Sequence, residues 1–143
     1  MLLIHIGYYR TASTFLQKRV FPIIDKDFKF KDNLKIALEN IVYPNSMRFN
    51  EKEIRNNLKN YISLKGMDNK TRVFSYECLT GHPYSGGANQ NEILQRLKKI
   101  FPSAFILLIF REQRDHIKSM YKKYVKDGGK KNINFFLEKR SSF

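Results

Sequence analysis

The sequence has almost no cysteine: Cys78 is the only one in 143 residues. A single thiol cannot form a disulfide within the chain, and it excludes zinc sites built from several cysteines. No apolar stretch approaches the roughly 18 to 20 residues that a membrane-spanning helix requires. Met1 is followed directly by a buried-strand pattern rather than by a cleavable signal peptide. We therefore expect a soluble protein of a reducing compartment, the cytoplasm.

Acidic residues are also scarce, at 13 Asp and Glu against 27 Lys and Arg, which gives a formal net charge of +14. This excess favours partners that carry negative charge: polyanions, anionic membrane surfaces, or phosphorylated and sulfated ligands. Because the basic residues are scattered, a lysine-rich surface without a dedicated partner explains the charge equally well. With 42% hydrophobic residues, the chain has enough apolar material for a core. We expect a single domain over residues 1–143, or part of one if the chain has been cut.

The first sixteen residues carry the clearest pattern. Before Gly7 the chain has a short, nearly continuous apolar run of Leu2, Leu3, Ile4 and Ile6, typical of a strand buried on both faces of a parallel sheet. The loop from Arg10 to Thr14 leads into a helix, and this order brings free backbone N–H groups and the positive end of a helix dipole to one point, which favours an anion such as phosphate. Arg10 and the hydroxyls of Thr11, Ser13 and Thr14 would add donors. An ordinary strand-to-helix turn with a Thr or Ser cap fits the same residues.

The rest of the chain alternates between helix and strand patterns. The predicted helices cover 14–20 (ending near Phe21-Pro22), 50–64, about 89–101 and 115–127, with weaker helical spacing over 34–41 and the start of another helix over 132–140; the predicted strands cover 29–31, 72–78 and 104–110. The stretch Ala104 to Phe110 is the most apolar and therefore the best candidate for the central strand. Asn89 or Asn91 caps one helix and Asp115 another. Strand, helix and strand joined this tightly form a βαβ unit, so we expect an α/β fold with three layers, α/β/α, around a parallel sheet.

Arg111 directly follows the apolar stretch 104–110 and so lies at the carboxyl end of the predicted strand. Ligands of open α/β sheets bind at the carboxyl ends of the strands, which makes Arg111 a candidate binding residue. Ser119 follows on the next predicted helix. The apolar stripe of that helix is interpreted as core packing; it consists of Ile117, Met120, Tyr121, Tyr124 and Val125.

Together, these two loops resemble the nucleotide-binding elements of the sulfotransferases that use 3′-phosphoadenosine 5′-phosphosulfate (PAPS). In that family the first loop commonly reads Pro-Lys-Thr-Gly-Thr-Thr and holds the 5′-phosphosulfate; here Tyr9-Arg-Thr-Ala-Ser-Thr14 occupies it. The family's second element is an Arg and a Ser that together hold the 3′-phosphate. Arg111 and Ser119 have the same spacing in this chain. The resemblance spans roughly residues 2–20 and 72–126. It implies a P-loop-NTPase-like sulfotransferase fold with these nucleotide-binding residues: Tyr9, Arg10, Thr11, Ala12, Ser13, Thr14, Arg111 and Ser119.

The resemblance also implies an activity: transfer of a sulfuryl group from PAPS to a hydroxyl or amine, with a carbohydrate or another small metabolite as the expected acceptor. Arg10 keeps the charge of the family's Lys but replaces a compact ammonium with a wider fork. Ala12 in place of Gly costs little if that residue is helical. The family's basic, Gly-containing C-terminal segment has no counterpart here, so the chain is expected to be truncated or diverged.

Sulfuryl transfer needs a base for the acceptor and cations for the charge on the bridging oxygen. Glu77, near the end of the predicted strand 72–78, resembles in position the His or Glu base of the family, and Arg10 is the expected catalytic cation. Capping of the loop at Gly81 or pairing with an arginine explains Glu77 without catalysis. His82 is the second candidate for the base.

The two remaining histidines are interpreted structurally. His5 lies inside a predicted buried strand and is expected to be a core histidine with satisfied hydrogen bonds, and His116 is expected to lie on the surface. The sequence has no carboxylate cluster and no His pair at ligand spacing, so we expect no metal in the chemistry.

Other classes of function remain open. A kinase of the P-loop class is disfavoured because Gly-x-x-x-x-Gly-Lys-[Ser/Thr] is absent and no Asp ends a predicted strand to hold Mg²⁺. A non-catalytic module that binds nucleic acid or a polyanionic glycan through its charge is a second alternative. A degenerate sulfotransferase fragment without turnover is a third. The sulfotransferase interpretation involves no specific nucleic acid and no membrane span.

Overall fold

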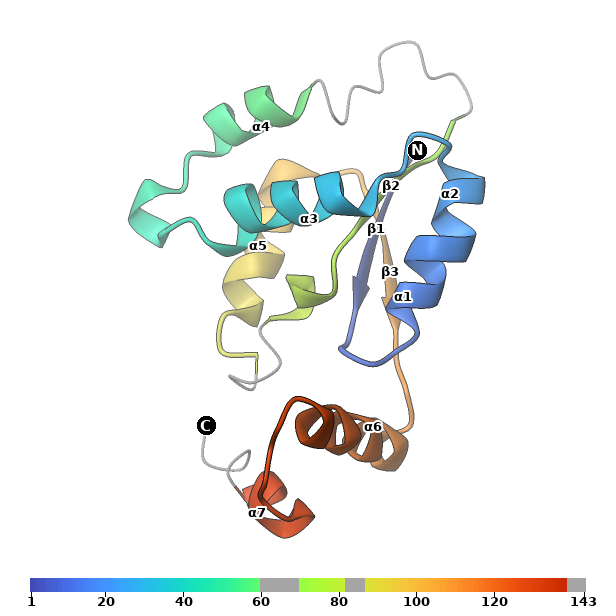
Figure 1. Cartoon of the computed structure of the whole chain (residues 1–143). Helices are drawn as coiled ribbons and strands as arrows, with labels where there is room; N and C mark the ends of the chain where they lie inside the picture. The colour runs from blue at the N-terminus through green and yellow to red at the C-terminus, as the bar shows by residue number, and fades with distance from the viewer. Residues whose placement is uncertain (60–69, 82–86, 139–143) are drawn as a thin grey trace.

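The computed structural model describes residues 1–59, 70–81 and 87–138 and contains a three-stranded parallel sheet. The strands are β1 (Leu2–Gly7), β2 (Arg72–Ser75) and β3 (Phe105–Ile109), and their spatial order is β2-β1-β3 (Figure 1). Ile4 of β1 lies opposite Phe74 on one side and opposite Ile106 on the other. The expected α/β class with a parallel sheet is therefore confirmed.

Helical segments occupy most of the remaining described chain. In chain order they are α1 (Ser13–Phe15), η1 (Leu16–Val20), α2 (Phe21–Ile24), α3 (Phe30–Ala37), η2 (Leu38–Val42), η3 (Ser46–Arg48), α4 (Glu51–Lys59), η4 (Glu77–Thr80), α5 (Gln90–Ile100), α6 (Gln113–Lys126) and α7 (Ile133–Glu138). Segments η1 and η2 are π-helical, and η3 and η4 are 3₁₀ turns. Across the described ranges, none of these helices combines the length and apolar character needed to cross a bilayer.

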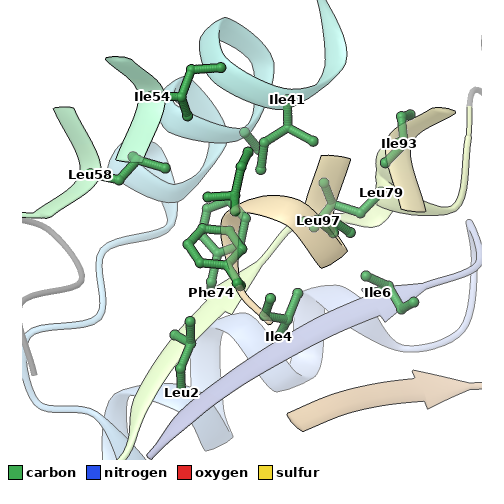
Figure 2. Packing of buried hydrophobic residues seen from close by; sticks show 13 residues of the cluster. Leu2, Ile4, Ile6, Ile41, Ile54, Leu58, Phe74, Leu79, Ile93 and Leu97 are labelled. Carbon is green, nitrogen blue, oxygen red and sulfur yellow. The ribbon is translucent and has the colours of Figure 1, made fainter. Parts of the chain in front are cut away.

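Helices pack on both faces of β1 and β2. On one face, Phe21 and Phe28 pack with Val73 of β2 in a small cluster. On the other face, α3, η2, α4 and α5 enclose the main core, in which side chains such as Ile41, Phe74 and Leu97 meet those of β1 (Figure 2). Strands β1 and β2 are thus covered by helices on both faces, while α6 lies beyond the carboxyl ends of the strands (Figure 1).

The prediction that 104–110 forms the central strand was wrong, because β1 occupies that place. The side chains of β3 remain largely exposed, Phe105 at 61% and Ile106 at 52%. No buried residue of the main core comes from β3. An apolar run predicts a strand, but it does not predict the position of that strand in the sheet or which elements pack against it.

Helical turns run without a break from Ser13 to Ile24, past the predicted end near Pro22. Pro22 lies at the junction where the π-helical turn η1 passes into α2, in the first turn of α2, a position at which proline is common. The strand predicted over 29–31 was also wrong, since α3 begins at Phe30. The Asn33 side chain donates to the Lys29 carbonyl and accepts from the backbone of β2, which fixes the start of that helix beside the sheet.

The later helices lie close to their predicted ranges, but two details of the second half of the chain were predicted wrongly. The strand predicted over 72–78 ends at Ser75, and the 3₁₀ turn η4 follows it. The cap of α6 is Glu112, whose carboxylate accepts the Asp115 N–H at 2.8 Å, and not Asp115 itself. Asn89 is the residue before α5. The part of the predicted helix 50–64 that follows α4 lies outside the described residues.

Arg96 fastens the segment between η2 and η3 to α5. Only 4% of Arg96 is exposed, and its guanidinium donates to the carbonyls of Ile41 at 2.6 Å and Pro44 at 2.7 Å. It also pairs with Glu92 and lies over the ring of Phe49, 4.9 Å from the centroid. Charge-assisted bonds to buried carbonyls of this kind hold the middle of the chain against the helical layer.

Candidate functional site

A pocket of about 440 Å³ opens at the carboxyl end of the sheet. It lies between the loop after β1, the start of η4 and the loop that leads into α6, and its lining residues are Tyr9, Arg10, Ala12, Ser13, Thr14, Glu77, Arg111, Ser119 and Lys123. All the residues predicted for the nucleotide site except Thr11 are among them. The carboxyl edge of a parallel sheet is where ligands of α/β folds bind, so the position matches that rule.

The backbone of the first loop is wound tightly. Arg10 has a φ of 69° and Ala12 a φ of 63°, which places two non-glycine residues in the left-handed region. The expectation that Ala12 is helical at little cost was therefore wrong, because a Cβ in that region costs about 1 to 2 kcal/mol. The first helical hydrogen bond joins the Phe15 N–H to the Ala12 carbonyl at 2.9 Å. The N–H groups of Ser13 and Thr14 precede that bond, and N–H groups at the start of a helix have no partner within the helix, which makes them candidate donors to an anion.

The hydroxyls of the loop have different surroundings. Thr11 is buried, and its hydroxyl donates to the Tyr8 carbonyl at 2.6 Å, so it holds the shape of the loop instead of lining the pocket. Ser13 is only 2% exposed, and its Oγ makes no well-formed hydrogen bond with any described residue. Thr14 is exposed at the mouth of the pocket. Of the three predicted hydroxyl donors, Ser13 and Thr14 line the pocket.

The two loops that the sequence places far apart touch each other. The Arg10 Nε donates to the Ser119 Oγ at 3.0 Å across 109 residues of chain. The Arg111 guanidinium donates to the Arg10 carbonyl at 3.3 Å. His116 Nε2 lies 2.6 Å from the Tyr9 carbonyl, which can only accept, so this nitrogen carries the hydrogen. The expectation that His116 is a plain surface residue was wrong, since it is half-buried and ties α6 to the loop.

Glu77 is the first residue of η4 and lines the same pocket. Burial raises the pKa of its carboxyl, while the nearby Ser13 hydroxyl and the Arg10 guanidinium pull that pKa partly back. A carboxylate with a raised pKa accepts a proton more readily than an exposed one, which suits a general base. His82, the second candidate for the base, lies outside the described residues.

Next to the pocket, Gly7 separates two buried polar groups. A Cβ at Gly7 would meet the His5 Nε2 and the Ser13 Oγ, each at 2.9 Å. His5 is fully buried, and its Nδ1 bonds to the Ser75 Oγ at 2.8 Å, but its Nε2 has no hydrogen-bond partner within the described ranges. Burial lowers the pKa of His5 to about 4, so the imidazole is neutral at pH 7. The predicted core position of His5 is thus confirmed, but the expectation that its hydrogen bonds are satisfied was wrong for Nε2 among the described residues.

Lys123 is the pocket residue that the sequence reasoning missed. It follows Ser119 by one helical turn, so both side chains lie on the same face of α6. The spacing of four residues from Ser119 was the feature of the sequence from which Lys123 could have been predicted as a site residue. With Arg10 and Arg111, Lys123 brings three cationic side chains to a pocket whose lining has one carboxylate, Glu77.

A second cavity of about 450 Å³ lies at the amino end of β2. Its two carboxylates both pair with Arg72, Asp25 at 3.0 Å and Asp27 at 2.7 Å, and its lining also contains Lys26 and Lys70. In the parts of the chain that the structure describes, no group of three or more His, Cys, Asp or Glu residues is arranged to hold a metal ion. The carboxyl-edge pocket, with three cations against one carboxylate and with its place at the carboxyl end of the sheet, is the better candidate for ligand binding.

Comparisons with protein-family models, with curated proteins and with solved structures found no match. Function must therefore be inferred from the residues of the pocket. They combine cationic side chains, backbone donors at the start of a helix and one half-buried carboxylate. This chemistry suits an anionic ligand that presents a reacting group to a base.

Proposed function

We propose that the protein is a sulfotransferase that moves a sulfuryl group from PAPS to a hydroxyl or amine acceptor in the cytoplasm. The observation that carries this proposal is the hydrogen bond between Arg10 and Ser119. It joins, in one basic pocket, the two elements whose sequence patterns resemble the 5′-phosphosulfate and 3′-phosphate sites of that family. The parallel sheet with a strand, loop and helix at its centre is compatible with a P-loop-type sulfotransferase fold.

The two ends of the nucleotide would bind different parts of the pocket. The loop Tyr9 to Thr14 holds the 5′-phosphosulfate with backbone N–H groups at the helix start and with the Arg10 side chain. Arg111 and Ser119 hold the 3′-phosphate. Because the Arg10 Nε donates to the Ser119 hydroxyl, the residues proposed for the two anionic ends lie next to each other in the pocket.

The transfer step uses Glu77 as the base. Its carboxylate takes the proton of the acceptor, whose oxygen or nitrogen attacks the sulfur as the bond between sulfur and the bridging oxygen breaks. The leaving product is 3′-phosphoadenosine 5′-phosphate (PAP), and the charge that develops on the bridging oxygen faces Arg10 and the helix start. We expect a carbohydrate or another small metabolite as acceptor, and no metal ion in the step.

Calorimetry with PAP and with 5′-AMP tests the nucleotide site. We expect PAP to bind more tightly than 5′-AMP. Arg111→Ala should lower the affinity for PAP by roughly ten- to hundredfold, the effect of one charge-assisted contact, and should leave the affinity for 5′-AMP little changed. Arg114→Ala is the matched control, because Arg114 is exposed on α6 and does not line the pocket. Equal affinity of the parent for PAP and 5′-AMP would remove the 3′-phosphate site and the proposal with it.

The net charge of +14 favours a second candidate, a module that binds nucleic acid or a polyanionic glycan without catalysis. Such a module would bind DNA or heparin with steep salt dependence. Substitution of Arg10 or Ser119 would leave that binding unchanged, because scattered surface lysines would carry it. Loss of PAP binding in the same variants distinguishes the two candidates.

A further inference from the structure

Lys123 is held by an acidic residue of its own helix. Its ammonium pairs with the Asp127 carboxylate, four residues later at the end of α6. Lys123 lines the carboxyl-edge pocket, whereas Asp127 is not among the lining residues and is about half exposed, at 46%. One cation of the pocket is therefore shared with a carboxylate outside it.

We infer that Lys123 is a third ligand of the 3′-phosphate and that Asp127 competes with the nucleotide for it. This inference rests on the proposed function. Ser119 and Lys123 lie on one face of α6, so a phosphate that accepts from the Ser119 hydroxyl lies within reach of the Lys123 ammonium. A dianionic phosphate attracts that ammonium more strongly than a single half-exposed carboxylate does.

The competition between Asp127 and the 3′-phosphate for the Lys123 ammonium lowers the affinity for the nucleotide. In the unliganded protein the ammonium is turned toward Asp127, and binding of a 3′-phosphate replaces this exposed ion pair with a contact inside the pocket. Exposed pairs four residues apart on a helix are weak, so the exchange is easy. Asp127 thereby weakens the binding of nucleotides that carry a 3′-phosphate and leaves the others unaffected.

Calorimetry at low ionic strength tests the inference with PAP and 5′-AMP as probes. Asp127→Asn should tighten PAP binding by about 1.5- to 2.5-fold, because one competitor for the ammonium is gone. Lys123→Met should weaken PAP binding by about five- to thirtyfold. In a chain that carries both substitutions, Asp127→Asn should add no further gain, and 5′-AMP should respond to neither change.

Glu51→Gln is the matched control. Glu51 forms an ion pair of the same spacing with Arg55, both side chains being 41% exposed, on α4 at the other end of the molecule from α6 (Figure 1). The substitution changes the net charge by the same amount as Asp127→Asn but touches no pocket residue. A gain in PAP affinity no larger than that of the control, or one that persists without Lys123, would overturn the inference while leaving the sulfotransferase proposal in place. A parent protein that does not bind PAP would instead overturn the proposed function itself.

Discussion

Replacing Gly7 with alanine should damage the fold and the candidate site together. The added Cβ would lie 2.9 Å from both the His5 Nε2 and the Ser13 Oγ, closer than real Cβ contacts. Both side chains are buried, at 0% and 2% exposure, so neither can turn toward solvent to make room. One of them must shift, and Ser13 is the first residue of α1 beside the pocket.

The expected change in the free energy of unfolding of Gly7→Ala follows from two opposing effects. Overpacking a buried site by one methyl group costs about 1 to 3 kcal/mol. Replacing glycine with alanine also stiffens the unfolded chain, which returns about 0.4 to 1 kcal/mol. We expect a net loss of about 1 to 2 kcal/mol in the free energy of unfolding, and about tenfold weaker PAP binding from the displaced loop.

Urea unfolding and PAP calorimetry measure the two effects on the same preparation. Gly128→Ala is the control, since Gly128 has a φ of 92° and a Cβ there would meet no atom within 4 Å. That variant should lose about 1 to 2 kcal/mol through backbone strain alone and keep the parent's PAP affinity. If Gly7→Ala matches the parent in both measurements, the gap beside Gly7 has no role in shaping the loop.

Four further predictions concern single groups or conditions. Glu77→Gln should lose about 10²- to 10⁴-fold in turnover with labelled PAPS and a panel of acceptors. Because burial raises the pKa of Glu77, ionisation of its carboxyl destabilises the fold. The variant should therefore be at least as stable as the parent at pH 7, and this advantage should vanish toward acid pH. A variant that unfolds at pH 7 would show that Glu77 has a structural role instead. Burial lowers the pKa of His5 to about 4, so the parent's stability should fall by up to about 3 kcal/mol as the pH drops from 6.5 to 4, and chemical unfolding of His5→Asn over that range should show a smaller slope. Arg96→Met should lose about 2 to 4 kcal/mol in urea unfolding because two carbonyls lose their donor, whereas Lys98→Met on the exposed face of α5 should change stability by no more than about 0.5 kcal/mol; equal effects would refute the anchoring role of Arg96. EDTA should leave sulfuryl transfer unchanged, and activity that is abolished by EDTA and restored by Mg²⁺ would support the kinase alternative.

The elements with strong local patterns could be predicted from the sequence. The apolar run Leu2 to Gly7 and the helical spacing over 90–100 identify β1 and α5 because burial and periodicity act within a few residues. The placement of Arg10 and Arg111 at one edge followed from the rule that parallel strands share a carboxyl end, and the assignment of Ser119 to the same site followed from the resemblance to the sulfotransferases. What the pattern could not show was which strand lies at the centre, because β3 is more apolar than β1 and yet remains exposed.

The details of the site depend on contacts between distant residues. Nothing local to Ala12 indicates a left-handed conformation, which the loop imposes on it. The roles of His116 and Lys123 depend on the orientation of α6 relative to the loop after β1, and this orientation appears only when the whole chain has folded. A periodic pattern assigns a residue to one face of a helix but does not identify what that face meets.

The central position of β1 also bears on how the protein reaches its native state. Among the described residues β1 pairs with strands that follow much later in the chain, as the bond between His5 and Ser75 across 70 residues shows, and the pocket forms when Ser119 meets Arg10 across 109. Contacts of such high sequence separation are slow to form, because loop-closure entropy is lost before they stabilise the chain. During synthesis β1 can therefore pair with β2 and β3 only after each of them has left the ribosome. In a refolding experiment the proposed PAP binding should then be among the last signals to recover, later than the helical signal of α5 or α6.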